Sequence, residues 1–75
     1  MKDVIMKDLI GTMIEYESGE LSDLKTLKLF SFLIKSGRAW ELQGSYGRTA
    51  HALIQDDWIS KEGKINSNKV EQNGI

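Results

Sequence analysis

Two series of apolar side chains, each stepping by four positions, run side by side through the first part of the chain: Ile5, Leu9 and Met13, and Met6, Ile10 and Ile14. Such a wide apolar stripe is typical of a helix that packs on more than one neighbour. We therefore predict a helix from about Asp3 to Ser18. Gly19 suits its C-terminal end, because glycine readily takes the left-handed conformation found there.

A second helix has its start signal at Ser22, whose hydroxyl can accept a hydrogen bond from the first turn. Asp23 follows at the positive end of the helix dipole, where an acid is favoured, and Lys35 lies near the negative end. Ser36-Gly37 is expected to end the helix. The inner face consists of Leu24, Leu27, Phe30 and Ile34, and the outer face carries Lys25, Lys28 and Lys35.

Leu29 and Phe32 fall beside this inner face, with Phe32 on the lysine side. A monomer of this size would leave the pair partly exposed, and an apolar pair next to a core stripe indicates an interface. The small core and the wide stripe of the first helix favour self-association as well. We therefore predict a homodimer whose interface contains Leu29 and Phe32.

The middle of the chain predicts shorter helical segments. Residues 38–43 can make one or two turns, with Trp40 and Leu42 as their apolar residues. Ser45 can cap a third helix that runs to about Gln55, with the inward-facing residues Ala50, Leu53 and Ile54.

The last part of the chain carries weaker signals. Residues 58–65 are compatible with a short hairpin, and whether they pair stays open. From Asn66 onward the sequence is polar and aperiodic. We predict an all-α fold: a single small domain of three to four helices over residues 1–65, with or without the C-terminal hairpin, and a flexible polar tail over residues 66–75.

The chain has 75 residues and no cysteine, which excludes disulfides and thiolate metal sites. Regular packing and oligomerisation remain as ways to stabilise so small a domain. The net charge of −1 argues against a generic polyanion binder. Residues 25–51 nevertheless hold five basic side chains against Glu41 alone, and this excess either solvates a helix face or binds a polyanion: Lys25, Lys28, Lys35, Arg38 and Arg48.

The apolar runs of the sequence are too short to span a membrane. Asp8 interrupts any stretch near the N-terminus that could resemble the apolar part of a secretory signal. The lack of cysteine fits a reducing compartment. We therefore expect a cytoplasmic protein.

Catalytic and metal-binding residues form no recognisable set. Asp56 and Asp57 are adjacent, so they do not share a helix face and are poor partners for acid–base catalysis. His51 is the single histidine, and no nucleophile–base pair accompanies it. A transition-metal site needs three or four converging ligands. We expect no enzyme activity, no metal site and no cofactor.

Gly44-Ser45-Tyr46-Gly47, followed by Arg48, is the most distinctive local motif. Two glycines at this spacing can bring backbone amides close to a phosphate, as in the GXXG loop of the KH fold. The rest of the sequence departs from KH, because two long helical segments come first and no clear strand precedes the motif. A tight turn is the interpretation we favour, and phosphate binding is the alternative.

Two aromatic residues near this motif have two interpretations each. Trp40 and Tyr46 can supply core area, since aromatic side chains dominate small cores. Either can instead anchor a binding partner, because Trp, Tyr and Arg are enriched in binding hot spots. We expect Trp40 to be buried, and for Tyr46 both interpretations remain open.

The run Ala39-Trp40-Glu41-Leu42-Gln43-Gly44-Ser45-Tyr46-Gly47-Arg48 resembles short uncharacterised bacteriophage proteins with the pattern Ala-Trp-x-Leu-Gln-Gly-x-Tyr-Gly-Arg. Two apolar residues and a glycine precede the pattern, and residues 52–59 continue the similarity. Asp57 stands where glycine is expected, so the resemblance does not determine the geometry of the turn after the third helix. The resemblance covers about half of the chain. It implies a phage origin and a bacterial host cytoplasm, but no activity.

A small phage protein with no recognisable active site generally works by binding. We expect an accessory protein that binds a bacterial host or defence protein and inhibits or redirects it. The candidate contact residues are Arg38, Tyr46, Gly47 and Arg48. One alternative is a nucleic-acid-binding module that uses the basic residues of segment 25–51 and loses affinity in salt. Another is a purely structural role in assembly.

Overall fold

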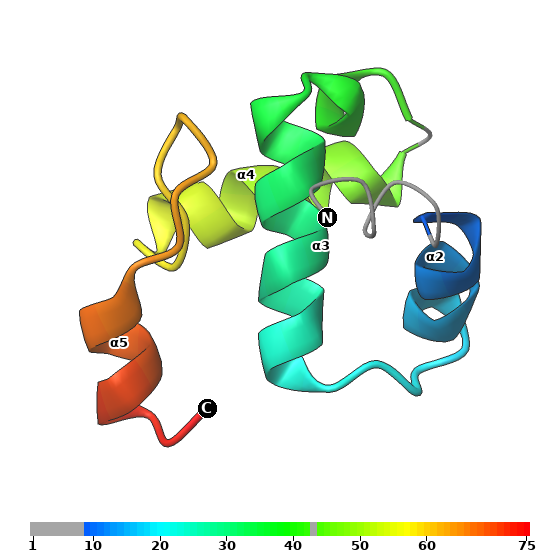
Figure 1. The fold of residues 1–75 in the computed structure, drawn as a ribbon. Coiled ribbons are helices and arrows are strands. Elements are labelled where there is room, and N and C mark those ends of the chain that lie inside the picture. The colour runs from blue at the N-terminus through cyan, green and yellow to red at the C-terminus, as the bar shows by residue number, and fades with distance from the viewer. Residues whose placement is uncertain (1–8, 43) are drawn as a thin grey trace.

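The computed structural model describes residues 9–42 and 44–75. Its elements are four α-helices and one 3₁₀ turn (Figure 1): α2 (Leu9–Glu17), α3 (Asp23–Lys35), η1 (Arg38–Trp40), α4 (Ser45–Gln55) and α5 (Ser67–Gln72). Over these residues no strand is present, so the predicted all-α class is confirmed. None of the helices described is long and apolar enough to cross a membrane.

Helix α3 is the centre of the fold, with α2 on one side of it, α5 on the other and α4 crossing it (Figure 1). Its start and end are those that the sequence predicts. The Ser22 hydroxyl accepts a hydrogen bond from the Lys25 N–H at 3.3 Å. At the other end, the Gly37 N–H donates to the Ile34 carbonyl at 3.1 Å.

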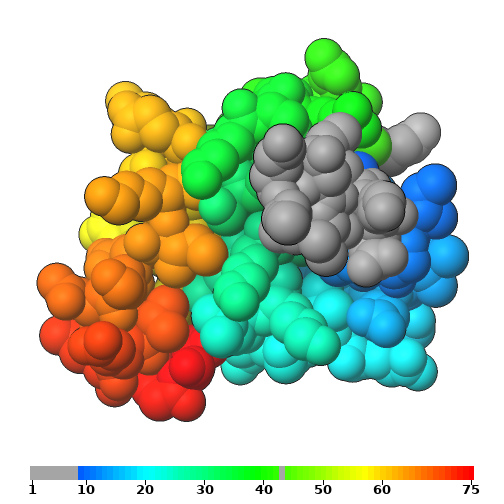
Figure 2. Space-filling view, in the orientation of Figure 1, coloured from blue at the N-terminus to red at the C-terminus, as the bar shows by residue number. Residues whose placement is uncertain are grey.

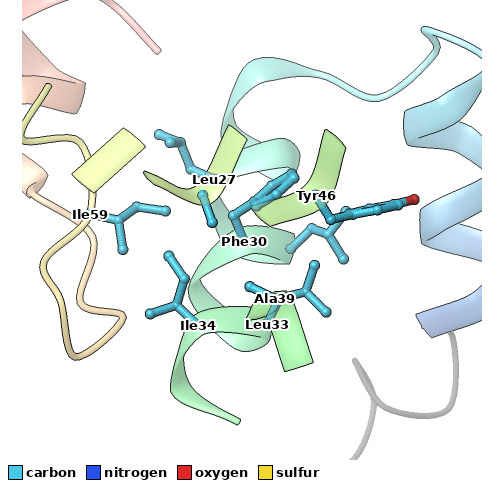
Figure 3. Close-up of a cluster of buried hydrophobic side chains, with 9 residues drawn as sticks. Leu27, Phe30, Leu33, Ile34, Ala39, Tyr46 and Ile59 are labelled. Carbon is cyan, nitrogen blue, oxygen red and sulfur yellow. The ribbon is translucent and has the colours of Figure 1, made fainter. Parts of the chain in front are cut away.

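The hydrophobic core comes mainly from α3. Apolar residues of η1, α4 and the segment after α4 complete it (Figure 3), and the buried set is Leu27, Leu29, Phe30, Leu33, Ile34, Ala39, Tyr46, Ala50 and Ile59. Leu53 and Ile54 pack against this core, which confirms the inward face predicted for α4.

Helix α2 docks on the core through Leu9, Met13 and Tyr16, and Tyr16 belongs to an aromatic cluster. Tyr16 lies edge-on to Phe30 with ring centroids 5.3 Å apart, and its ring lies 5.6 Å from that of Tyr46. No residue of α2 is fully buried, so its attachment rests on partly buried side chains. The sequence predicted this helix from Asp3 to Ser18, and residues 3–8 lie outside the described part of the chain.

The two aromatic residues near the glycine motif differ in burial. Tyr46 is only 6% exposed, whereas Trp40 is 52% exposed. The prediction that Trp40 is buried is therefore wrong. In the single turn of η1, the small side chain of Ala39 takes the inward position and is fully buried, which leaves the adjacent indole facing outward.

Residues 58–65 form a hairpin-like turn. Ile59 and Ile65 make one isolated antiparallel bridge. The Ser60 N–H donates to the Lys64 carbonyl at 2.8 Å, and the Asn66 N–H donates to the Trp58 carbonyl at 2.9 Å. The sequence left open whether this segment pairs. Its two sides do pair, but the paired stretch is too short to form strands.

The segment predicted to be a flexible polar tail, residues 66–75, contains the helix α5. The Asn66 side chain caps the helix by accepting a hydrogen bond from the Lys69 N–H at 3.2 Å. Val70 packs against the core, and Lys69 Nζ lies 4.9 Å from the centre of the Trp58 ring. These contacts extend the packed domain beyond the predicted boundary at residue 65.

Candidate functional site

A broad hollow of about 670 Å³ lies where η1 meets the outer face of α4. We call it the Trp40 hollow, and its lining residues are Trp40, Leu42, Gly44, Gly47, Arg48, His51, Ala52 and Gln55. The four lining residues at positions 48, 51, 52 and 55 have the spacing of one helix face. The hollow therefore joins one exposed aromatic side chain to one face of α4.

The glycine motif forms part of this hollow, but it is not a loop. Gly44 precedes α4 with φ 27°, and no side chain caps the helix there. Ser45 is the first helical residue, so the prediction that its side chain caps α4 is wrong. Gly47 lies inside the first turn, where an added Cβ would be 3.5 Å from the Ala39 carbonyl oxygen. The motif thus brings α4 close to η1, and its second half is helical rather than a KH-type loop.

The chemistry of the Trp40 hollow is apolar and basic. Trp40 offers a large apolar surface to solvent, and Trp and Arg are the residues most enriched in binding hot spots. Arg48 and His51 are the ionisable residues that line the hollow, and both are bases. Such a surface suits a partner that presents an apolar group next to an acid.

The structure brings together only part of the predicted contact set. Gly47 and Arg48 line the hollow, whereas Arg38 is exposed on η1 outside the lining. Trp40 lines it although the sequence assigned this residue to the core. Whether Trp40 faces the hollow or the core depends on which side of η1 the rest of the chain covers. No signal in the sequence indicates which side that is.

Tyr46, another predicted contact residue, presents little surface to a partner, because its ring is part of the core. Figure 3 shows the ring extending from the core toward α2. Its hydroxyl donates a hydrogen bond to Glu17 Oε2 at 2.6 Å. Burial, followed by the hydrogen bond to Glu17, raises the pKa of Tyr46 above the ordinary value of a tyrosine.

The two residues of the predicted dimer interface, Leu29 and Phe32, differ in burial. Leu29 is only 1% exposed, so it cannot form an exposed interface with Phe32, which is partly buried against the core. The reason is that α2 packs near this side of α3, and Leu29 lines a second hollow shared by the two helices.

The basic residues of segment 25–51 do not line one groove. Lys25 and Lys28 line the second hollow, between α2 and α3, whereas Arg48 lines the Trp40 hollow. The two hollows have no lining residue in common. This separation disfavours a continuous track for a nucleic-acid backbone.

The acidic pair after α4 lies at the C-terminal cap of that helix. Asp56 and Asp57 are both exposed, and Asp57 has a left-handed backbone with φ 65°. This is the position where the phage resemblance leads us to expect glycine. Across the described ranges, no three His, Cys, Asp or Glu side chains converge in a way that could hold a metal ion.

Comparison with protein families gives one finding. A family model described as a domain of unknown function, DUF7417, matches residues 4–73. The matched range contains all the described helices and the Trp40 hollow. No curated protein and no solved structure matches the chain.

Proposed function

Because the chain belongs to the DUF7417 family, whose description assigns no activity, we propose a function from its surface: the protein binds another protein through the Trp40 hollow. The observation that carries this proposal is the half-exposed indole of Trp40, which lines the same hollow as Arg48. Leaving so large an apolar side chain in water is unfavourable, and a bound partner would remove it from solvent.

The partner is a bacterial host or defence protein, which the small protein inhibits or redirects in the host cytoplasm. The similarity of residues 29–59 to short bacteriophage proteins supports this part of the proposal. The protein acts by occupying its partner's surface, without chemistry of its own.

The proposal is tested by affinity capture of tagged protein from a bacterial lysate, with and without nuclease. We expect one protein to be recovered in stoichiometric amount in both samples. Arg48→Ala should remove most of it, because truncating one partner of a charge-assisted contact in an interface weakens binding strongly. Lys61→Ala, an exposed cation at the tip of the turn after α4, is the matched control and should capture normally.

Nucleic-acid binding is the competing function, because an exposed indole next to an arginine can also stack on a base. It predicts that capture disappears with nuclease and that affinity falls steeply with salt through counterion release. Either result would replace the protein-binding proposal.

A further inference from the structure

Helix α2 presents an exposed apolar ridge. Ile10 is 74% exposed and Ile14, one turn further on, is 58% exposed. Two large apolar residues on one short helix leave an apolar strip that the described part of this chain does not cover. In Figure 2 the atoms of α2 form one edge of the molecule.

Gly11 lies on the same side of α2 and is exposed. Glycine inside a helix costs about 1 kcal/mol relative to alanine. No close contact in the described chain requires a glycine at this position, since an added Cβ would have no atom within 4 Å. A glycine in this place lets a second backbone approach the helix closely.

A groove runs beside the ridge. This is the hollow between α2 and α3, about 400 Å³ in volume, with Gly11 and Leu29 among its apolar lining. Its polar lining has both signs of charge, with Glu15 contributed by α2 and Lys25 and Lys28 contributed by α3. One surface thus carries an apolar ridge, an apolar groove, an acid and two bases.

We propose that this surface is a homodimer interface, in which the α2 ridge of each copy packs into the groove of the other. A two-fold interface uses the same surface on both copies, so that surface must complement itself. Here Ile10 and Ile14 complement the groove, and Glu15 of one copy faces the lysines of the other. A chain of 75 residues also gains stability from such a contact.

This interface is separate from the proposed partner site, since the groove and the Trp40 hollow share no lining residue. It also differs from the dimer interface predicted from the sequence, which required Leu29 to be exposed. That residue instead lines the groove and is buried within its own copy.

The test is sedimentation velocity of the full chain over a wide concentration range. Wild type should move from 8.5 kDa toward twice that mass as concentration rises. Ile14→Asp should weaken dimerisation at least about 30-fold, as expected for a hot-spot residue, with an unchanged helical circular dichroism spectrum. Lys61→Asp is the matched control, because it introduces the same acidic side chain at an exposed position outside the interface and should dimerise normally.

A charge-exchange experiment tests whether the groove binds a second copy of this chain. Glu15→Lys alone and the double variant Lys25→Glu/Lys28→Glu should each dimerise poorly, because like charges meet. An equimolar mixture of the two should restore a dimer, since the exchanged charges then pair. A monomeric wild type at the highest concentration, a dimeric Ile14→Asp protein or a mixture that stays monomeric would each overturn the proposal.

Discussion

The hydroxyl of Tyr46, in the first turn of α4, donates a 2.6 Å hydrogen bond to the carboxylate of Glu17, the last residue of α2. The ring of Tyr16 packs against that of Tyr46 next to this bond. Since no residue of α2 is fully buried, these contacts at its C-terminal end add to an attachment that otherwise rests on the partly buried Leu9 and Met13.

Removing the hydroxyl should loosen α2. Tyr46→Phe keeps the buried ring but loses the bond, and we expect a loss of roughly 1–2 kcal/mol in the free energy of unfolding, measured in urea. Glu17→Gln and the double variant complete a double-mutant cycle. If the two single losses add without coupling, the bond does not stabilise the fold.

Ionisation of Tyr46 should weaken the fold at alkaline pH. Its pKa is raised in the folded protein, so the folded state holds the phenolic proton more tightly than the unfolded state does. The resulting stability is present below the unfolded pKa of about 10 and is lost as the pH rises above it. The stability difference between wild type and Tyr46→Phe should therefore shrink above about pH 10. A difference that stays constant from about pH 8 to 11 would contradict this account.

Gly63 lies where the turn after α4 meets α3. Its φ is +92°, and an added Cβ would lie 2.8 Å from the Ser31 carbonyl oxygen and 3.0 Å from the Lys35 nitrogen. Gly63→Ala should therefore cost more than roughly 2 kcal/mol, through both backbone strain and a clash with backbone atoms.

Gly19→Ala is the matched control for that substitution. Gly19 has φ +78°, but an added Cβ would have no atom within 4 Å. It should lose only about 1 kcal/mol, from the left-handed conformation alone. Equal losses in the two variants, measured by urea denaturation, would show that the Gly63 contact with α3 is not tight.

Asp57 occupies a left-handed position that glycine fits better. The Asp57 N–H donates to the Ile54 carbonyl at 3.1 Å and the Trp58 N–H donates to the Leu53 carbonyl at 2.9 Å, the bonds of a Schellman cap. Asp57→Gly removes the left-handed strain and a negative charge at the negative end of the helix dipole.

We expect Asp57→Gly to raise the thermal midpoint and to add roughly 0.5–1 kcal/mol of stability. Asp56→Gly is the control, because it removes the same negative charge at a residue with an ordinary φ of −88°, where a glycine relieves no strain and adds freedom to the unfolded chain. A gain from Asp56→Gly as large as that from Asp57→Gly would mean that charge alone, and not backbone conformation, causes the effect.

The sequence predicts the elements whose signals are local. Ser22 and Ser36-Gly37 define the bounds of α3, because caps act through side chains and backbone within one turn. Helix α5 was missed because its six residues are too short to show a periodic apolar pattern. Its one usable signal was Asn66, which caps it.

The candidate site depends on burial, which local signals do not give. Trp40 and Tyr46 are six positions apart and similar in character, yet one faces solvent and the other forms part of the core. Which of them is buried is decided by Ala39 fitting against the core and by α2 covering Tyr46. For the same reason Leu29 could not be recognised as buried from its place on α3 alone.

The most direct test of the Trp40 hollow is quantitative capture from bacterial lysate by wild type and by Trp40→Ala, with Lys61→Ala as the control. We predict that Trp40→Ala keeps the circular dichroism spectrum and urea midpoint of a folded protein but recovers at least about tenfold less of the captured protein, as expected for a hot-spot anchor. Recovery of the same protein at an undiminished level by Trp40→Ala would contradict the assignment of this hollow as the binding site.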